Sequence, residues 1–494
     1  MKTLKKILIA NRGEIARRII RTAHAMGIHT VAVYENEDKD SLYVKEATSA
    51  HFLPAGFLDQ DTILEICRRE NADAIHPGYG FLSENAAFVR KVEAAGITFI
   101  GPSADAMDRM GDKTAARIEA KAAEVPLLPG AEIDDASGLK PVERKKLVSE
   151  IGLPVVLKAA AGGGGKAQAI IEEESEIDAA FDKVLREAER LYKSQALVVE
   201  RYLLKARHVE VQVLGNAAKK NFSLFDRDCS AQRNNQKIIE EAPAPNLPDK
   251  VRDALHASAI RLADHVGYRN AGTMEYLYDP AREEFYFLEM NTRLQVEHTV
   301  TEMITGLDLV REQILIASGI ATDYAAIKVS GHAIQARICA EKSDGSYQPS
   351  TGEIVQYVEP RGVRVDSGVD VGSVVSGKYD NMIAKLIVHA ENRDAASELL
   401  DAKLSEYVVN GIHTNIPLLK KLLKDKNFLA VTHYTRYLQK EFVPPQSDPE
   451  SAASIAAILL YEIEKAESAR LYGNLAGFSN TRVSPGDAPL KTSA

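Results

Sequence analysis

The sequence predicts an α/β protein that opens with a doubly wound parallel sheet. The segment 6–10 has the apolar character of a short buried strand, and the turn at 11–14 is followed by apolar residues at helical spacing. A second strand is predicted at 30–34, which completes a βαβ unit. Strands predicted at 74–76 and 98–101 continue the pattern. No GxGxxG follows the first strand, so this region is not predicted to bind a dinucleotide.

Length and composition indicate a multidomain protein of a reducing compartment. The 494 residues exceed what one core usually organises, so about three domains are expected. A net charge of −9 argues against nonspecific nucleic-acid binding, which needs a basic surface. The three cysteines, Cys67, Cys229 and Cys339, are far apart, which predicts neither a zinc site nor a disulfide framework. The N-terminal apolar stretch is too short for a signal peptide and no apolar run can span a membrane, so a cytoplasmic protein is expected.

A run of four glycines lies between two predicted strands, at 154–158 and 169–171. Consecutive glycines let backbone N–H groups approach phosphate oxygens, because no Cβ is in the way. The run is not a P-loop, since GxxxxGK[ST] is absent. We interpret it as a mobile lid over phosphates; the alternative is a structural hairpin tip, which rarely needs four glycines. Taken alone, Lys158 and Lys113, which opens a predicted helix, are ordinary solvated lysines.

The stretch 285–298 carries the strongest indication of chemistry. Its first half is aromatic and apolar, as expected for a buried strand, and its polar residues project from one face if the backbone stays extended. A carboxylate and an amide oxygen suit Mg²⁺, arginine and glutamine can hold a small oxyanion, and a second carboxylate can move a proton. The alternative is a salt-bridged edge strand. The polar residues are Glu289, Asn291, Arg293, Gln295 and Glu297.

Three segments between the glycine run and this stretch offer further polar groups. An apolar strand at 197–203 ends in a hinge-like segment that can line an adenine pocket through its backbone and Leu203. Strict alternation at 208–213 predicts a half-buried strand with polar groups on one face. The cationic and amide groups at 226–245 can meet a triphosphate or coat a surface loop.

A further strand at 272–276 brings a carboxylate towards the same place. We expect Glu275 to pair with Glu289 across neighbouring strands. Two carboxylates that meet in a buried sheet are costly unless a cation lies between them, which favours a metal site.

The C-terminal third changes character twice. From 331 to 443 the sequence predicts a more β-rich region with helices towards its end. Prolines at 444–449 indicate a linker, and 450–470 is an Ala-rich predicted helix. The last residues hold Gly, Ser, Pro and Thr and are expected to be loosely ordered.

Together these motifs resemble the biotin carboxylases, ATP-grasp enzymes found in acetyl-CoA, propionyl-CoA, methylcrotonyl-CoA and pyruvate carboxylases. The resemblance covers residues 4 to 443. It implies an ATP-grasp fold with an N-terminal doubly wound domain, a mobile glycine-rich lid and a C-terminal mixed α+β domain. The expected boundaries are 1–112, 113–330 with the lid at 130–203, 331–443, and a linker, helix and flexible tail at 444–494. The motifs are IANRGEIA (9–16), HPGYGFLSEN (76–85), MGDK (110–113), the tetraglycine, RDCS (227–230), EEAPAP (240–245) and EMNTRLQVEH (289–298).

The resemblance also implies site residues. For ATP they are Lys113, Lys158, Gly162, Gly163, Gly164, Gly165, Glu200, Tyr202, Leu203, His208, Gln232 and Asn235, with Lys237 nearby as a catalytic residue. For two Mg²⁺ or Mn²⁺ ions they are Glu275, Glu289 and Asn291. For bicarbonate they are Arg293, Gln295, the backbone of Val296, and Glu297 as the base. For biotin they are Tyr79 and Arg337, which would stabilise the enolate.

The implied reaction is ATP-dependent carboxylation of biotin. Bicarbonate attacks the γ-phosphate to give carboxyphosphate, which breaks down to CO₂ and phosphate, and the phosphate deprotonates biotin. No internal Met-Lys-Met occurs, so biotin is expected on a separate carrier protein rather than on this chain, with a carboxyltransferase completing the pathway. A homodimer or a larger carboxylase complex is expected, with no nucleic acid and no membrane.

Seven positions depart from the family pattern. We expect an active enzyme with an altered nucleotide affinity, because none of them is a proposed metal, bicarbonate or enolate residue. The rival functions are an ATP-grasp ligase for another carboxylate and a nucleotide-sensing scaffold. The departures are Ala167, Gln168 and Ala169 in the lid, Asn235 for a common histidine, Thr299 for proline, Gln335 for glutamate and Thr351 for proline.

Overall fold

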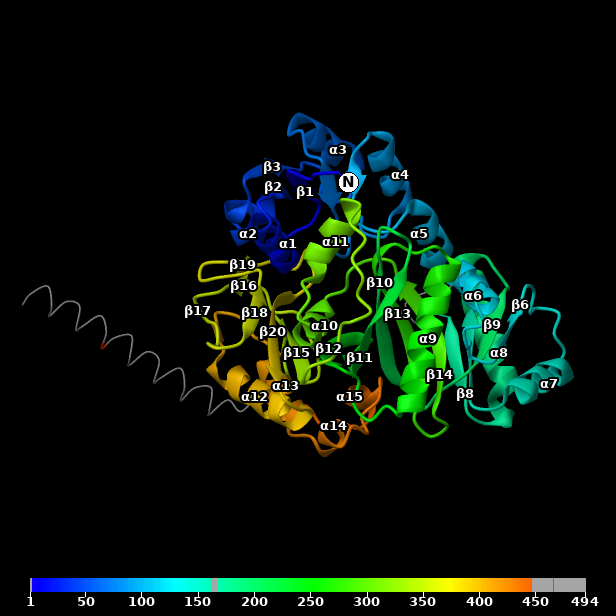
Figure 1. Cartoon of the computed structure of the whole chain (residues 1–494). Coiled ribbons are helices and arrows are strands. Elements are labelled where there is room, and N and C mark those ends of the chain that lie inside the picture. Colours follow the sequence, from blue (N-terminus) through cyan, green and yellow to red (C-terminus); the bar gives the residue numbers. More distant parts are fainter. Residues whose placement is uncertain (1, 161–166, 447–464, 466–494) are drawn as a thin grey trace, which may run out of the picture. The chain divides into compact units, whose positions relative to one another are not determined.

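The computed structural model describes residues 2–160, 167–446 and 465 (Figure 1). The chain divides into two units, Met1–Pro444 and Pro445–Ala494, and the fold below is that of the first. Most of the linker, helix and tail predicted past 443 lies outside the described residues. The predicted lid glycines Gly162, Gly163, Gly164 and Gly165 also lie outside them.

The N-terminal region forms the predicted doubly wound sheet. Its five strands are parallel and lie in the order β3-β2-β1-β4-β5. Ile7 and Ile9 of β1 pack into one core and Leu8 packs into another, because alternate side chains leave opposite faces of the strand. With both faces covered, the strand is apolar throughout. The strands are β1 (Lys6–Ile9), β2 (His29–Tyr34), β3 (Ser49–Phe52), β4 (Ala74–His76) and β5 (Thr98–Phe99), and the helices are α1 (Gly13–Ala25), α2 (Leu42–Glu46), α3 (Gln60–Arg69), α4 (Ala86–Ala94) and α5 (Ala104–Gly111).

A second sheet of four strands follows helix α6 (Lys113–Ala122), which begins at Lys113 as predicted. Its order is β6-β9-β7-β8, and α7 and α8 pack against it. The two strands that flank the glycine run, β7 and β8, pair as an antiparallel hairpin, so the predicted strand–loop–strand arrangement is confirmed. The elements are β6 (Gly130–Ile133), α7 (Pro141–Ile151), β7 (Val155–Ala159), β8 (Gln168–Ile171), α8 (Ile177–Tyr192) and β9 (Leu197–Arg201).

Ala167 precedes β8 in a left-handed backbone conformation, with φ of 50°. The residue is buried and its carbonyl accepts a 3.0 Å hydrogen bond from the Ala159 amide, so the hairpin holds this conformation. A Cβ costs about 1–2 kcal/mol in this region, and glycine avoids that cost. We expect Ala167→Gly to raise the free energy of unfolding by about 0.5–1 kcal/mol in urea denaturation, after the extra freedom of glycine in the unfolded chain is subtracted.

Ala169, two residues further on within β8, is the matched control. Its φ is not positive, so the same substitution only adds freedom to the unfolded chain. Ala169→Gly should lower the free energy of unfolding by about 0.5–1 kcal/mol. Shifts of the same sign in both variants would contradict the strain assigned to Ala167.

The largest sheet is antiparallel and has eight strands in the order β14-β13-β10-β11-β12-β15-β20-β18. Figure 1 shows β15 and β20, from the region predicted at 331–443, beside β11 and β12 of the preceding region. One sheet therefore continues through both regions. Its strands are β10 (Arg207–Gly215), β11 (Asn221–Arg233), β12 (Gln236–Ala242), β13 (Asn270–Asp279), β14 (Glu284–Asn291), β15 (His332–Cys339), β18 (Arg364–Ser367) and β20 (Met382–Ala390).

Helices and short strands complete this unit. Helix α9 packs on β10 and β11, α10 packs on β11, β12 and β15, and α12 packs on β15 and β20. The helices are α9 (Asp249–His265), α10 (His298–Thr305), α11 (Leu309–Ala317), α12 (Arg393–Glu406), α13 (Ile416–Leu423), α14 (Lys426–Leu429) and α15 (Tyr437–Lys440). The short strands are β16 (Gly352–Glu353), β17 (Gln356–Val358), β19 (Val374–Val375) and β21 (Val408–Asn410).

One expectation for the middle of the chain is wrong, and one of two alternatives is excluded. The strand at 208–213 is buried on both faces rather than half-buried, because its valines pack towards α9 while its polar face meets other charged groups. Of the two alternatives for 226–245, the surface loop is excluded, since most of the segment forms β11 and β12 in the interior of the sheet. In both segments, pairing partners distant in sequence decide burial.

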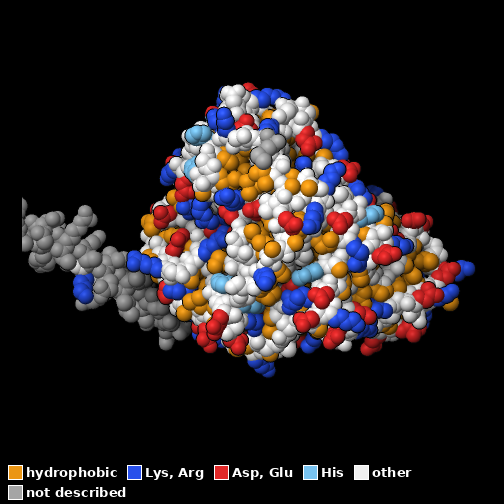
Figure 2. Space-filling model, in the orientation of Figure 1, with side chains coloured by type: hydrophobic (Ala, Val, Ile, Leu, Met, Phe, Trp, Pro, Cys, Tyr) orange, Lys and Arg blue, Asp and Glu red, His pale blue; other side chains and the backbone are white. Residues whose placement is uncertain are grey.

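The outer surface mixes charges of both signs. Figure 2 shows acidic and basic side chains interspersed over one face. Within the described part of the chain, no helix is both long enough and apolar enough to cross a membrane. Cys67, Cys229 and Cys339 are buried free thiols.

Candidate active site

Two carboxylates face each other across neighbouring strands of the large sheet. The ladder between β13 and β14 pairs Glu275 with Glu289, which confirms the pairing predicted for them. Asn291 ends β14, and its side-chain amide donates to Glu275 Oε1 at 2.9 Å. The acidic pair therefore lies within the β13–β14 ladder, near the end of β14, with an amide beside it.

The shared strand face of Gln295 and Glu297 depended on an extended backbone up to Glu297, and β14 ends at Asn291, so that condition is not met. Glu84 of the N-terminal region accepts hydrogen bonds from the two residues that follow Asn291. The Thr292 N–H donates to Glu84 Oε1 at 3.0 Å, and Arg293 Nε donates to Glu84 Oε2 at 2.9 Å. The chain bends there and leaves the ladder.

A turn then returns the chain to the sheet. The His298 N–H donates to the Gln295 carbonyl at 3.3 Å, and Glu297 occupies the N-cap position of α10. Gln295 Nε2 donates to Glu275 Oε1 at 2.7 Å. The polar residues predicted along one strand face therefore converge by a turn, and Arg293 Nη2 contacts the Asn291 side-chain oxygen at 2.7 Å.

Lys237 of β12 lies at the centre of this convergence. Its ammonium donates to Glu210 at 2.7 Å, to Glu275 at 2.9 Å and to Glu297 at 2.6 Å. Burial alone would lower the pKa of Lys237, but the three carboxylates outweigh it and raise that pKa well above its usual value. Burial alone would raise the pKa of Glu297, but Lys237 outweighs it and lowers the pKa to about 2. Glu297 is therefore an ionised carboxylate, and two cations donate hydrogen bonds to it.

The second cation is Arg337 of β15. Its Nη2 donates to Glu297 Oε2 at 3.0 Å, and its Nε donates to Glu240 Oε1. Glu240 also accepts a 2.9 Å bond from the Gln335 side chain, and Gln335 in turn accepts from the Thr299 hydroxyl. The guanidinium of Arg337 is thus held between two buried glutamates.

Arg227 of β11 forms the floor of the site and is fully buried. Its Nε donates to Glu210 Oε1 at 2.6 Å, and its Nη2 donates to Gln295 Oε1 at 2.7 Å. Since Gln295 Oε1 faces Arg227, its Nε2 faces Glu275. The orientation of this amide is therefore set by the charges around it.

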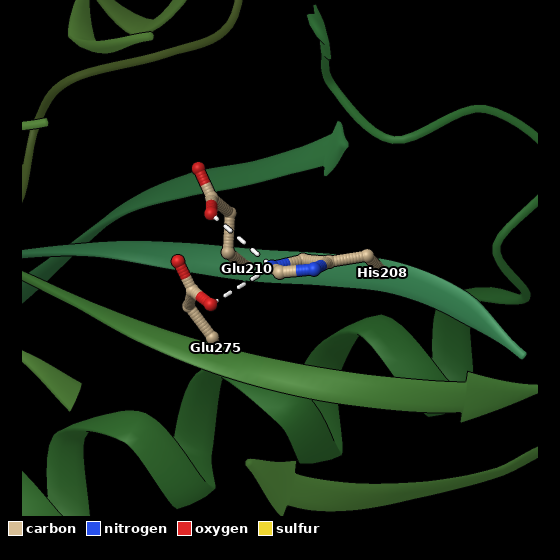
Figure 3. Close-up of side chains that lie close together, drawn as sticks. All are labelled: His208, Glu210 and Glu275. Carbon is tan, nitrogen blue, oxygen red and sulfur yellow. Dashed lines mark ion pairs between the residues drawn. The ribbon is translucent and has the colours of Figure 1, made fainter. Parts of the chain in front are cut away.

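His208 lies beside Glu275, one member of the acidic pair. Figure 3 shows its ring pointing between the carboxylates of Glu210 and Glu275, with Nε2 3.6 Å from the first and 3.2 Å from the second. Burial alone would lower the pKa of His208, but Glu275 outweighs it and the pKa rises to about 9. His208 therefore balances charge in this cluster as a cation.

The acidic pair fits a divalent metal ion. Burial and the nearby Glu275 raise the pKa of Glu289, so the two carboxylates destabilise each other without a cation between them. The nearest ammonium to Glu289 is that of Lys113, at 3.8 Å from Oε2. Carboxylate oxygens are hard donors, and a pair whose negative charge is not fully neutralised suits Mg²⁺ or Mn²⁺.

Of the residues implied for ATP phosphates, two lysines lie beside acidic groups. Lys158 forms an ion pair with Glu200, which also accepts a 2.6 Å bond from Arg117. Lys113 is largely exposed above Glu289. Lys158 is therefore paired with a buried carboxylate, whereas Lys113 is a largely solvated lysine, as expected of it taken alone.

The residues implied for adenine and biotin lie on several separate elements, and of these Gln232 contacts the central cluster. Tyr202 and Leu203 follow β9 and are half-buried, and the Tyr202 hydroxyl accepts from Arg436. Gln232 Nε2 lies 3.1 Å from His208 Nδ1. Asn235 is exposed at the β11–β12 turn. Tyr79 is half-buried against the N-terminal core, and among the described residues no hydrogen bond joins it to Arg337.

Comparisons with known proteins agree on one family. The models described as "Biotin carboxylase, N-terminal domain", "Carbamoyl-phosphate synthase L chain, ATP binding domain" and "Biotin carboxylase C-terminal domain" match residues 3–107, 112–324 and 335–440. Biotin carboxylase 1 of Bacillus subtilis is 43% identical over 447 residues, which cover 88% of this chain and 98% of that protein. The chain belongs to the biotin carboxylase family. The three-part ATP-grasp architecture expected from the sequence is confirmed.

Two further relatives extend this result. The dimeric biotin carboxylase domain of Hydrogenobacter thermophilus 2-oxoglutarate carboxylase, solved with MgADP, ADP and bicarbonate, has a TM-score of 0.81 and 40% identity. The match covers 89% of this chain and 98% of that chain. The mitochondrial methylcrotonoyl-CoA carboxylase subunit alpha of Arabidopsis thaliana is 44% identical over 462 residues, which cover 90% of this chain but 62% of that subunit. The chain thus spans nearly all of the biotin carboxylases and about three fifths of this longer subunit.

Sequence reasoning missed several residues that biotin carboxylase chemistry would use here. Glu210, Arg227, Glu240 and Glu84 all bond directly to predicted site residues. Each lies in a motif or an alternating strand that is visible in the sequence, but no role is predicted for that residue. The signal was present in the alternation of 208–213, whose polar face predicts a shared polar neighbourhood.

Two of the departures from the family pattern contact each other. Thr299 and Gln335 are hydrogen-bonded, and Gln335 shares Glu240 with Arg337. Gln335 is therefore linked to Arg337 through Glu240, and among the described hydrogen bonds neither Thr299 nor Gln335 contacts Arg337 directly. A third departure, Asn235, adopts φ of 62° at a two-residue hairpin turn, a conformation that asparagine tolerates well.

Proposed function

We propose that this chain transfers a carboxyl group from bicarbonate to the biotin of a carrier protein, driven by ATP. ATP-dependent carboxylation of biotin is the activity of the family and the first half-reaction of biotin-dependent carboxylases. A carboxyltransferase would then pass the carboxyl group to its final acceptor. The Arabidopsis relative carries an acyl-CoA carboxylase name, but that identity belongs to a protein longer than the matched part.

One observation carries the proposal: the Lys237 ammonium joins Glu275 of the acidic pair to Glu297 at 2.9 Å and 2.6 Å. The metal-binding carboxylates and the candidate base are thereby linked through one cation. Arg337 approaches the other oxygen of Glu297 at 3.0 Å. An anion between these groups would have positive charge on two sides and a carboxylate within proton-transfer reach.

The proposed roles follow from this arrangement. Arg293, Gln295 and the Val296 amide would bind bicarbonate, and Glu297 would remove its proton. Arg337 would stabilise negative charge on the biotin ureido oxygen, and Tyr79 would lie along the biotin. Mg²⁺ or Mn²⁺, when bound at Glu275, Glu289 and Asn291, would neutralise phosphate charge and align the γ-phosphate with its attacking oxygen. Lys113, Lys158, Glu200, Tyr202, Leu203, His208, Gln232 and Asn235 would surround the nucleotide.

The assembly is also a proposal. The Hydrogenobacter thermophilus domain is described as a dimer, which supports a homodimer for this chain at 40% identity. Two metal ions, a biotin carrier protein and carboxyltransferase subunits complete the proposed complex.

The test is release of phosphate from ATP with Mg²⁺ and bicarbonate, with and without free biotin. We expect the rate to rise several-fold with biotin and to fall to background without bicarbonate. Turnover only with another carboxylate would favour a different ligase of this superfamily. ATP binding without turnover in any mixture would contradict a catalytic role.

A further inference from the structure

The peptide group between Gln295 and Val296 is fixed from behind by a buried histidine. His298 Nδ1 lies 2.7 Å from the Gln295 carbonyl oxygen, which also accepts the 3.3 Å bond from the His298 N–H. The His298 side chain is completely buried. A single residue thus binds one carbonyl oxygen through both its backbone and its side chain.

The chemistry of the contact determines the tautomer. A carbonyl oxygen only accepts, so Nδ1 must carry the proton. Burial lowers the pKa of His298 well below its usual value, and Lys385, Arg18 and Arg364 lower it further. The ring is therefore neutral, and its Nε2 has no hydrogen-bond partner among the described residues. His298 acts as a fixed one-proton donor.

The next carbonyl is held in the same way by a lysine. Lys385 of β20 is completely buried, and its Nζ donates to the Val296 carbonyl at 3.2 Å. Glu14 of α1, at 3.2 Å from the same nitrogen, balances its charge. Two successive carbonyl oxygens are therefore anchored by buried donors from separate parts of the chain.

Anchoring a carbonyl also aims the amide of the same peptide group. A trans peptide is planar, and its C=O and N–H point in opposite directions. With the Gln295 oxygen turned towards His298, the Val296 N–H must point away from it. Among the described residues, the Val296 N–H has no hydrogen-bond acceptor. The turn thus presents a backbone donor without a partner among the described residues.

We propose that His298 is a positioning residue for bicarbonate, holding the Gln295 carbonyl so that the Val296 N–H of the same peptide group is directed at the anion. Lys385 fixes the following peptide group through the Val296 carbonyl. This inference rests on the proposed function. The His298 side chain does not touch the substrate, so it acts through the backbone. Its removal should weaken bicarbonate binding while ATP binding is preserved.

The test compares two substitutions at one position. Asparagine places an amide donor near the position of Nδ1, whereas leucine has similar bulk and no donor. We expect His298→Leu to raise the KM for bicarbonate about ten- to a hundredfold with the KM for ATP within about twofold, and His298→Asn to stay within about threefold of wild type for both. His389→Leu is the control, because His389 Nε2 also lies 2.7 Å from a backbone carbonyl, that of Ser330, near the end of β20.

The outcomes separate the two proposals. If the wild type shows no bicarbonate- and biotin-dependent phosphate release, the proposed function fails. If the wild type is active and the leucine and asparagine variants have the same KM for bicarbonate, only the positioning role fails. Should His298→Leu not fold, His298→Gln replaces it, because its amide reaches the Nε2 position and leaves Nδ1 without a substitute; an unchanged KM for bicarbonate there would also overturn the inference.

Discussion

Replacing Glu297 by glutamine is expected to lower the kcat of biotin-dependent phosphate release by about a hundred- to ten-thousandfold. The amide keeps the volume of the carboxylate but cannot accept a proton. Lys237 and Arg337 both bond to Glu297, at 2.6 Å and 3.0 Å, so the geometry is constrained. Because the pKa of Glu297 is lowered to about 2, the carboxylate is ionised throughout the usual assay range, and the loss should not depend on pH.

Glu302→Gln is the matched control for this substitution. Glu302 lies on α10, one turn beyond Glu297, and is likewise buried and bonded to two cations, Arg18 and Arg364. Among the described hydrogen bonds its carboxylate contacts none of the proposed substrate-binding residues, and its Oε2 lies 3.8 Å from Nε2 of His298, the ring nitrogen that does not face the Gln295 carbonyl. Its loss should reduce stability but change kcat less than about threefold. A Glu297→Gln variant that kept more than about a tenth of the kcat would refute Glu297 as the base.

Local patterns were sufficient to predict the acidic pair. Glu275 and Glu289 lie on apolar strands separated by a short turn, and neighbouring strands of this kind usually pair in sequence order. The proposed metal site rests on that pairing. The strand–loop–strand around the glycine run and the opening βαβ unit were predicted in the same way, from periodicity within short windows.

Long-range pairing was beyond local patterns. Lys237 of β12 reaches across β11 to Glu210 of β10 and to Glu275 of β13, and it also bonds to Glu297 at the start of α10; nothing within β12 specifies those partners. The bend at Asn291 depends on Glu84, which is distant in the chain. The condition of one extended line from Glu289 to Glu297 is not met for this reason, although the residues still converge.

Arg227→Met is expected to lower the free energy of unfolding by about 3–5 kcal/mol, because it removes a charge from a fully buried network. Besides Glu210 and Gln295, Arg227 donates to Gln212 at 2.7 Å, Thr301 at 2.8 Å and Thr273 at 3.1 Å. Urea denaturation measures the loss. Arg17→Met is the control: its ion pair with Glu46 is partly exposed on both sides, so the expected loss is below about 1 kcal/mol.

A double-mutant cycle with Glu210→Gln separates charge balance from packing. Most of the cost of Arg227→Met should come from leaving Glu210 with less positive charge, since Lys237 at 2.7 Å is shared among three carboxylates. Neutralising Glu210 in the same protein should therefore recover about 1–3 kcal/mol of the loss. Strictly additive losses would mean that Arg227 stabilises the sheet only through its hydrogen bonds to threonine hydroxyls and glutamine amides. The buried network around Arg227 would then be stabilised by hydrogen bonds rather than by charge balance. The charges of Arg227 and Glu275 would no longer explain the orientation of the Gln295 amide.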